Sequence, residues 1–216
     1  SPLLVDNDGL TLGQQGGRVQ IHGASIALEG PGVPAISLYH AAADMDRITL
    51  TGNHSGIEWN ANNNGNFPSS LSRTHLTGSS NCLLLVDHTA LSGYDNTISA
   101  DCTGSVLLQN SQVNWSGLTD ATGTHTIQLD STSHLHLHQP VDVDLSLASI
   151  ASSATVDVAW DITVWVVNNF TNGIPNANIN ASFTSFEPAL EEETNDLGYV
   201  FLPDFIGQRW TNTGAS

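Results

Sequence analysis

The sequence predicts an all-β protein, made of a β-solenoid followed by a second, smaller β module. Helical periodicity is nearly absent, and short apolar runs alternate along the 216 residues with turns rich in Gly, Asn, Ser and Asp. Hydrophobic residues make up 39% of the chain, which is enough to fill a core. The apolar runs also resemble one another, and such self-similarity is typical of repeat architectures.

The repeat is a short strand, a tight polar turn and a second short strand. Its five units begin at Arg18, Arg47, Arg73, Thr97 and Thr126, so the spacing ranges from 24 residues (73 to 97) to 29 (18 to 47). An array of β-hairpins is one explanation. A solenoid explains the pattern better, because matching apolar positions stacked coil upon coil bury a continuous column. The predicted inward positions are Val19, Ile21, Ile26, Leu28, Ile48, Leu50, Ile57, Trp59, Leu76, Leu83, Leu85, Ile98, Ala100, Val106, Leu108, Ile127, Leu129, Leu135 and Leu137.

This pattern resembles the right-handed parallel β-helix repeat family over about residues 10–147. The resemblance implies parallel strands in successive coils, with Leu50, Leu76, Ala100 and Leu129 in one inward stack. Pectate lyases, polygalacturonases and related carbohydrate-active enzymes share this fold. The resemblance therefore implies polysaccharide as one class of partner, although a fold alone does not establish a function.

The pattern changes after residue 147, so we divide the chain into a β-helix (1–147), a small polar junction (148–155) and a second module (156–216). The second module has a long alternating first strand, a Gly-x-Pro-x-Ala corner from Gly173 and a Thr-x-Asp-x-Gly turn from Thr194. These features resemble the Ig-like or carboxypeptidase-regulatory-like β-sandwich modules of prokaryotic surface proteins, which act as spacers or stalks. The segment is short for a complete sandwich, which leaves an incomplete module open.

The charge of the chain excludes several classes of partner. Four arginines, no lysine and 21 acids give a formal net charge of -17. Such a surface repels phosphate backbones and anionic membranes, which excludes nucleic acid as a partner. No apolar run approaches the length of a membrane span. Charged residues are only 12% of the chain, and its abundant Ser, Thr, Asn and Gly are common in secreted proteins, so we expect an extracellular or cell-surface location.

Two covalent features stay open at the level of sequence. Cys82 and Cys102 could pair in an oxidising compartment, but the repeat offsets them along neighbouring coils. Sequons for N-glycosylation begin at Asn53, Asn114, Asn169 and Asn180.

Three histidines alternate with two leucines in the segment from His134 to His138. If Leu135 and Leu137 point inward, His134, His136 and His138 point outward, because side chains alternate along a strand. His-x-His pairs bind zinc or copper on strands. The repeat alignment, however, places no acid or histidine column beside the trio and offers no fourth ligand. We favour a polar outer face and keep a transition-metal site as the alternative.

An oxygen-rich stretch at the N-terminus, with Asp6 and Asp8, resembles the start of a calcium-binding loop. The glutamate that completes such a loop does not follow at the required spacing. We favour the interpretation that this stretch forms a turn or an N-terminal cap of the solenoid. A calcium site is the alternative.

One pair of acids is predicted on the outer surface of the repeat. Asp101 and Asp130 follow the inward Ala100 and Leu129, and the alignment stacks them on neighbouring coils. Two stacked carboxylates could share a proton or a cation. They could equally be turn residues that accept hydrogen bonds from their own backbone, which is the interpretation that we favour.

We expect a non-catalytic segment of a large secreted or cell-surface protein that acts in adhesion, display or structural support. β-Helical lyases generally use a basic residue to abstract a proton, and the chain has no lysine. The alternative is a carbohydrate-binding or carbohydrate-cleaving β-helix, which requires an exposed aromatic platform beside polar groups. Trp115 lies in a turn-rich stretch and is the best candidate, whereas Trp59 is predicted to face inward. A trimeric phage or virus fibre is a third interpretation, and other cell-surface proteins are the remaining partners that we consider.

Overall fold

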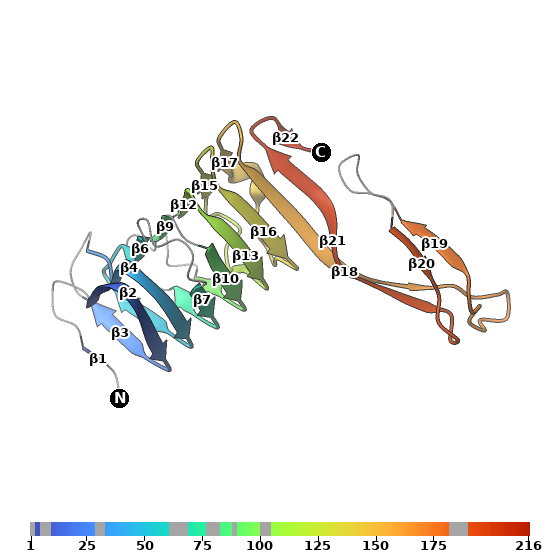
Figure 1. Cartoon of the computed structure of the whole chain (residues 1–216), viewed down its shortest axis with the longest axis horizontal. Helices are drawn as coiled ribbons and strands as arrows, with labels where there is room; N and C mark the ends of the chain where they lie inside the picture. Colours follow the sequence, from blue (N-terminus) through green and yellow to red (C-terminus); the bar gives the residue numbers. More distant parts are fainter. Residues whose placement is uncertain are drawn as a thin grey trace.

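The computed structural model describes residues 3–4, 10–28, 33–60, 69–76, 83–87, 90–99, 105–181 and 190–216. Strands make up 62% of the protein and helices 2%, which confirms the all-β prediction. A β-solenoid of about 5 turns forms most of the molecule, as in a parallel β-helix. Figure 1 shows its strands stacked side by side, with a β-ribbon leaving the last coil.

Each coil contributes strands to three faces. Face 1 is a 6-stranded parallel sheet. Its members are β1 (Leu3–Leu4), β3 (Ser25–Leu28), β5 (Thr49–Gly52), β8 (His75–Leu76), β11 (Thr97–Ile98) and β14 (Thr119–Asp120).

Faces 2 and 3 belong to one 14-stranded sheet, whose strand order turns back at β4 (Ile36–Asp46). The long strands β2 (Leu10–His22) and β4 run through both faces. Face 2 continues with β6 (Gly56–Asn60), β9 (Leu83–Asp87), β12 (Val106–Gln109), β15 (Ile127–Leu129) and β17 (Ser149–Ile150). Face 3 continues with β7 (Ser69–Ser72), β10 (Ala90–Tyr94), β13 (Gln112–Ser116), β16 (His134–His138) and the start of β18 (Thr155–Trp165).

A single left-handed residue turns the chain from face 3 to face 1 in every coil. These residues recur at intervals of 22 residues (95 to 117) to 26 residues (47 to 73). The N–H of each one donates to a carbonyl of the next coil, which locks the corner. Arg47 and Arg73 occupy this position, as expected for matching members of a repeat. The series is Gly23, Arg47, Arg73, Asp95, Gly117 and Gln139, with φ of 63°, 53°, 48°, 49°, 67° and 51°.

Columns of apolar side chains fill the interior of the coils. Full burial of a side chain of this size contributes about 1.5–3 kcal/mol. Face 1 supplies Ile26, Leu50, Leu76 and Ile98; face 2 supplies Ile36, Leu38, Ile57, Trp59, Leu84, Val86, Val106, Leu108, Ile127 and Leu129; face 3 supplies Met45, Leu71, Leu91, Val113, Trp115, Leu135, Leu137, Val156 and Val158.

The predicted repeat is correct in kind but wrong in part of its alignment. The second, third and fourth units run from face 1 to face 2, whereas the first runs from face 3 to face 1 and the fifth from face 2 to face 3. Leu50 and Leu76 are therefore stacked neighbours, but Leu129 lies on face 2 beside Leu108. Ala100 lies outside the described residues. The error arose because all three faces share the same alternation of apolar and polar residues.

The register of β9 also differs from the prediction. Leu84 pairs with Ile57, and both Leu84 and Val86 are buried, whereas Leu85 points outward and is partly exposed. The predicted inward position Leu85 is thus displaced by one residue, and the side chain of the other, Leu83, lies outside the described part of the structure. Four consecutive apolar residues carry no alternation, so the sequence could not fix which side chains face the core.

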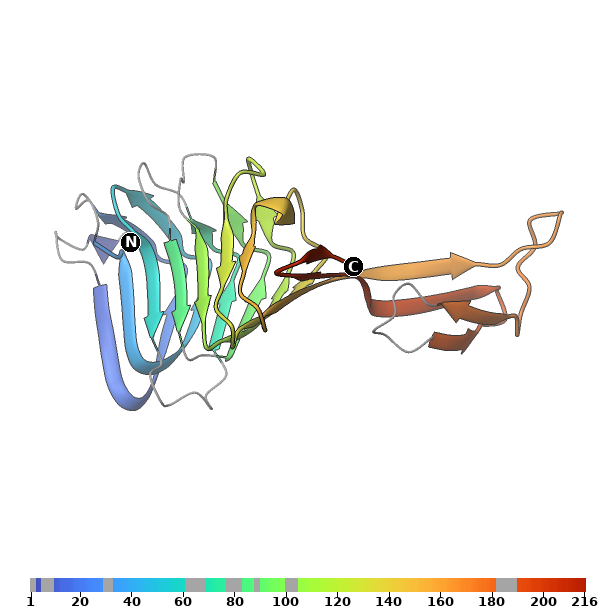
Figure 2. The same cartoon turned by 90° about the horizontal axis from the view of Figure 1, so that it is seen from above.

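The C-terminal part begins inside the solenoid. Residues 155–159 of β18 pair in parallel with β16, so they form a coil strand. The rest of β18 pairs only with the antiparallel β21 (Tyr199–Thr211) and projects beyond the coils as a two-stranded ribbon (Figures 1 and 2). β21 ends in a short hairpin with β22 (Gly214–Ala215). Residues 148–155, predicted as a junction, contribute β17 and the first residue of β18.

A second hairpin accompanies the outer half of the ribbon. It consists of β19 (Asn178–Ala181) and β20 (Leu190–Glu193), and both views place it alongside the ribbon. An Ig-like sandwich needs two packed sheets of several strands, and the described residues supply two strands in each layer here. The sandwich therefore stays a prediction.

Helix is scarce in the described residues. The one helical element is the 3-10 turn Leu145–Leu147, with Asp144 as its N-cap. None of the described helices could span a membrane.

Candidate functional site

Outward side chains of face 3 form two straight columns that lead to the ribbon. Parallel pairing places the residues of successive coils side by side, about 4.8 Å apart. The first column contains Ser92, Asn114, His136 and Asp157, and the second contains Tyr94, Ser116, His138 and Ala159. Polar groups from three successive coils thus share one surface, whereas Asp157 and Ala159 of the next coil are buried.

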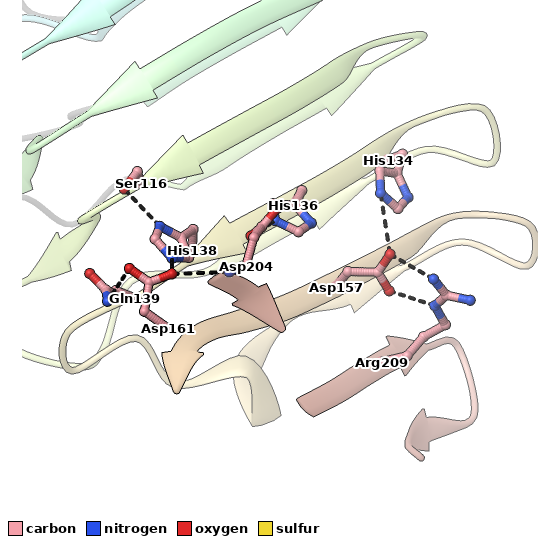
Figure 3. A network of polar contacts seen from close by, with 9 residues as sticks. All are labelled: Ser116, His134, His136, His138, Gln139, Asp157, Asp161, Asp204 and Arg209. Atoms are coloured by element: carbon pink, nitrogen blue, oxygen red, sulfur yellow. Dashed lines mark hydrogen bonds and ion pairs between the residues drawn. The ribbon is translucent and has the colours of Figure 1, made fainter. Parts of the chain in front are cut away.

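Two histidines of β16 hold two aspartates of the ribbon (Figure 3). Nε2 of His136 lies 2.7 Å from Oδ1 of Asp204, and Nε2 of His138 lies 2.9 Å from Oδ1 of Asp161. An ionised carboxylate only accepts, so each Nε2 carries the proton. The backbone N–H of Asp204 donates to Asp161 at 3.0 Å, which links the two pairs. We call His136, His138, Asp161 and Asp204 the clasp.

An irregularity in the ribbon makes the clasp possible. The ladder between β18 and β21 shifts between Trp160 and Ile162, so Asp161 lies outside the regular register. Asp204 adopts a left-handed conformation with φ of 52°. The backbone N–H of Asp204 donates to Asp161, and this hydrogen bond is the main reason why the pKa of Asp161 lies below its usual value. The hydrogen bond from His138 lowers this pKa further.

The third histidine belongs to a separate network. Nδ1 of His134 bonds to the hydroxyl of Thr155, and its Nε2 lies 3.4 Å from Oδ2 of Asp157. Arg209 donates to both oxygens of Asp157 at 2.5 and 2.7 Å. Burial lowers the pKa of His134 despite the neighbouring Asp157. His134 is therefore neutral at pH 7.

The histidine trio points outward as predicted, but its predicted surroundings are wrong. Leu135 and Leu137 are fully buried, whereas each of the three histidines faces a different carboxylate. The sequence alignment found no acid column because it compared β16 with strands of face 2 and assigned Asp157 and Asp204 to another module. No three metal-binding side chains converge within the part of the chain that the structure describes.

A groove of about 530 Å³ runs along this surface, within the usual size range of ligand pockets. The clasp forms one side, Asn114 and Ser116 lie on the solenoid sheet, and Pro203 belongs to the ribbon. Tyr94 pairs with Ser116 on the neighbouring strand and exposes 52% of its surface. Tyr94 therefore adjoins the groove through Ser116 and does not line it. It was not predicted as a site residue, although the alternation in its strand signals an outward position.

Trp115 is not the exposed platform that the sequence predicted. Only 1% of it is exposed and it lies in the core cluster, although it is also among the residues that line the groove. Its indole lies against Gly93, where an added Cβ would come within 2.4 Å of Trp115 Cδ1. Trp115 belongs to the regular strand β13, whose alternation directs Val113 and Trp115 inward. Trp59 faces inward as predicted.

Asp130 shapes a turn between β15 and β16. Its carboxylate accepts from Ser133 Oγ at 2.7 Å and from the backbone N–H groups of Thr132 and Asn110, both at 3.1 Å. Burial acts to raise the pKa of Asp130, but these hydrogen bonds outweigh it and the net pKa is lowered. Asp130 therefore acts as a turn residue.

Several predicted site residues lie outside the described residues. They are Asp6 and Asp8 of the calcium alternative, Asp101 of the outward pair, and Cys82 and Cys102. The alignment that stacked Asp101 on Asp130 rested on placing β11 and β15 on one face, whereas these strands belong to different sheets.

A buried acid–histidine pair closes the corner from face 1 to face 2. Asp120 Oδ1 lies 2.6 Å from Nδ1 of His125, and Asp120 Oδ2 accepts from the backbone N–H of the same histidine at 2.9 Å. Each side chain is 3% exposed. The hydroxyl of Thr122 also contacts Nδ1 of His125, at 3.3 Å, on the side of the ring that faces Asp120. This arrangement suits closure of the loop rather than activation of a nucleophile, and no motif in the sequence signals it.

All four arginines are engaged by aspartates. Arg18 pairs with Asp44 at 2.7 Å, and Arg47 and Arg73 both pair with Asp46, at 3.0 and 2.7 Å. The fourth is the Arg209–Asp157 pair. The chain has no lysine, and none of its four arginines is among the residues that line the groove.

No family model matches this chain, and no curated protein or solved structure matches it either.

Proposed function

We propose that this chain is a non-catalytic segment of a large secreted or cell-surface protein that acts in adhesion, display or structural support. One observation carries the proposal: β18 is both a coil strand of the solenoid and the first strand of the ribbon. A force or an orientation imposed on the ribbon passes into the solenoid through one backbone and its ladders of hydrogen bonds. Such continuity suits a spacer that holds a surface at a fixed place.

Contacts at the junction support a fixed geometry. The second half of β21 pairs with β18 beside the last coil, so that Trp210 lies opposite Val156 and packs against the core. β21 thereby covers a strand edge that would otherwise be open to pairing with another chain. The clasp and the Arg209–Asp157 pair add side-chain links between the ribbon and the solenoid.

We also propose that the C-terminal part is an Ig-like or carboxypeptidase-regulatory-like module, acting as a stalk. Its two sequence motifs lie together in space, since a Cβ on Gly173 would come within 1.9 Å of the carbonyl of Leu197. Thr194 Oγ1 donates to the carbonyl of Ile174 at 2.7 Å and accepts from Ala177 N–H at 2.9 Å. These contacts explain why the corner and the turn need a glycine and a threonine.

An extracellular or cell-surface location fits the chemistry of the surface. The formal net charge of -17 and the low share of charged residues, 12%, suit a polar, hydrated exterior.

The alternative is a carbohydrate-active β-helix, and one observation favours it: two carboxylates, Asp161 and Asp204, line the groove. A glycosidase needs one carboxylic acid that stays protonated to act as the general acid. The lowered pKa of Asp161, due first to the N–H of Asp204, keeps that group ionised instead. The clasp therefore supports an anchoring role for Asp161.

The experiment that tests the proposal combines turnover with binding. The full chain is incubated with neutral and uronate-rich polysaccharides, with and without calcium, and new reducing ends and unsaturated products are measured. We expect no product. Product formation that is lost in Asp161→Asn or Asp130→Asn would overturn the non-catalytic proposal and establish the alternative.

A further inference from the structure

The outer surface of face 3 changes character along the solenoid. On the early coils, its polar side chains satisfy one another: Asp44 accepts from Arg18 and Ser70, and Asp46 accepts from Arg47 and Arg73.

On the later coils, outward polar groups are available. Ser92 and Asn114 are exposed neighbours on adjacent strands, and neither side chain has a hydrogen-bond partner among the described residues. Both line the groove beside the clasp. The second oxygen of Asp204 adds an acceptor, since only Oδ1 is bonded to His136 and the residue is 59% exposed.

From these groups we propose that the groove binds a neutral, polyhydroxylated ligand, namely a glycan chain without carboxylate or sulfate groups. The inference rests on the proposed role of this chain in adhesion or display, and it names the ligand class. Amide, hydroxyl, imidazole and carboxylate groups offer both donors and acceptors to sugar hydroxyls. The exposed ring of Tyr94, next to Ser116, supplies an apolar surface for the C–H face of a sugar ring.

Charge selects against acidic glycans. The groove contains the carboxylates Asp161 and Asp204, and every arginine of the chain is paired elsewhere. An anionic ligand would approach a chain of formal charge -17 and find no lysine or arginine to pair with. Uronate-rich and sulfated polysaccharides are therefore excluded as ligands.

Geometry selects the orientation of the bound chain. The column of Ser92, Asn114 and His136 crosses the strands at right angles, with one polar group per coil. Coils are about 4.8 Å apart, which is close to the advance of one hexose unit along an extended glycan. The glycan lies along the solenoid axis, with successive sugars over β10, β13 and β16, and it ends at the wall formed by Pro203 and Asp204.

The test truncates outward side chains to alanine, which leaves the core intact. We expect Tyr94→Ala and Asn114→Ala each to weaken binding about tenfold, as truncation of a central contact does. Tyr39→Ala is the matched control for the first, because Tyr39 is exposed by 38% on face 2. Gln112→Ala is the control for the second, because it lies two residues before Asn114 on the same strand but outside the groove. Both controls are expected to bind as the unmodified chain does.

Isothermal titration calorimetry of the full chain measures the outcome. The probes are a soluble β-glucan, a galactomannan and oligomers of N-acetylglucosamine, with polygalacturonate as the anionic comparison. Binding of at least one neutral probe, weakened in both Asn114→Ala, inside the groove, and Tyr94→Ala, beside it, supports the inference. Absence of binding to all neutral probes, or tighter binding to polygalacturonate, overturns it.

The same samples separate this inference from the proposed function. If a neutral glycan binds equally to Tyr94→Ala, Asn114→Ala and the controls, the groove is the wrong site and the adhesive role stands. If a neutral glycan is cleaved, the proposed function fails, and weakened binding in Tyr94→Ala and Asn114→Ala still locates the ligand.

Discussion

His136 on β16 and Asp204 on β21 lie 68 residues apart in the sequence and are joined by a 2.7 Å contact between Nε2 and Oδ1. This contact holds the base of the ribbon against the outer face of the solenoid. It also places Asp204 and Pro203 as a wall of the groove. The same pair thus links the mechanical junction and the candidate binding surface.

Removal of the Asp204 side chain is expected to loosen the junction without unfolding the chain. Asp204 is 59% exposed, and exposed ion pairs contribute less than about 1 kcal/mol, so the global stability of Asp204→Ala changes little. Amides of β21 near the junction should exchange faster with solvent, measured by hydrogen–deuterium exchange. Asp196→Ala, in an exposed turn of the outer ribbon, is the control. Unchanged exchange in Asp204→Ala would show that the clasp does not hold the ribbon.

The register of β9 is tested by a pair of neighbouring leucines. Leu84 is fully buried between Ile57 and Val106, so Leu84→Ala should cost about 2–5 kcal/mol of unfolding free energy. Leu85 points outward, so Leu85→Ala should change stability by less than about 1 kcal/mol. Chemical denaturation measures both variants. The opposite order would restore the register predicted from the sequence.

Close packing of the backbone in the C-terminal module is tested at Gly173. A Cβ at this position would meet the carbonyl of Leu197, so Gly173→Ala should destabilise the module by about 1–3 kcal/mol. Gly23→Ala is the control, because a Cβ added at Gly23 would meet no atom within 4 Å. Alanine at the left-handed φ of 63° of this position costs about 1 kcal/mol by itself. Hydrogen exchange resolved along the ribbon should report the loss locally. If the module of Gly173→Ala is as protected from hydrogen exchange as that of the unmodified chain, the close contact is refuted.

The buried Asp120–His125 pair predicts a pH dependence. Burial acts to raise the pKa of Asp120, but hydrogen bonds from the side chain and the N–H of His125 outweigh it, and the net pKa is lowered. A lowered folded-state pKa adds stability above the unfolded value of about 3.9, and this stability is lost as the pH falls through the folded value. Asp120→Asn should therefore lose about 1–3 kcal/mol at pH 7 and show a shallower decline in acid.

Thermal unfolding between pH 7 and pH 3 measures this difference. Asp142→Asn, at an exposed position in the following coil, should follow the original pH profile. Parallel profiles for Asp120→Asn and the unmodified chain would rule out a stabilising role for the pair.

Alternation within single strands was readable from the sequence. Ile57 with Trp59 and Leu135 with Leu137 face inward as predicted, because every second side chain of a strand shares a side. The face to which each strand belongs was not readable. All three faces carry the same pattern, so Leu129 was assigned to the wrong stack.

The candidate site was predicted only in part. The outward histidines follow from local alternation, but their partners do not. Asp161 reaches His138 only because the ladder of the ribbon is irregular, and Asp204 reaches His136 only because β21 returns to the last coil. Trp115 was misjudged because turn-like residues around it concealed a regular strand.

β18 joins the solenoid and the ribbon into one extended body, and small-angle X-ray scattering of the full chain in solution measures whether the two parts hold one orientation. We expect a scattering curve that a single elongated conformation fits, with the ribbon projecting from the last coil as in Figures 1 and 2. A curve that requires an ensemble of ribbon orientations, or a compact particle with the ribbon folded back on the coils, would contradict it.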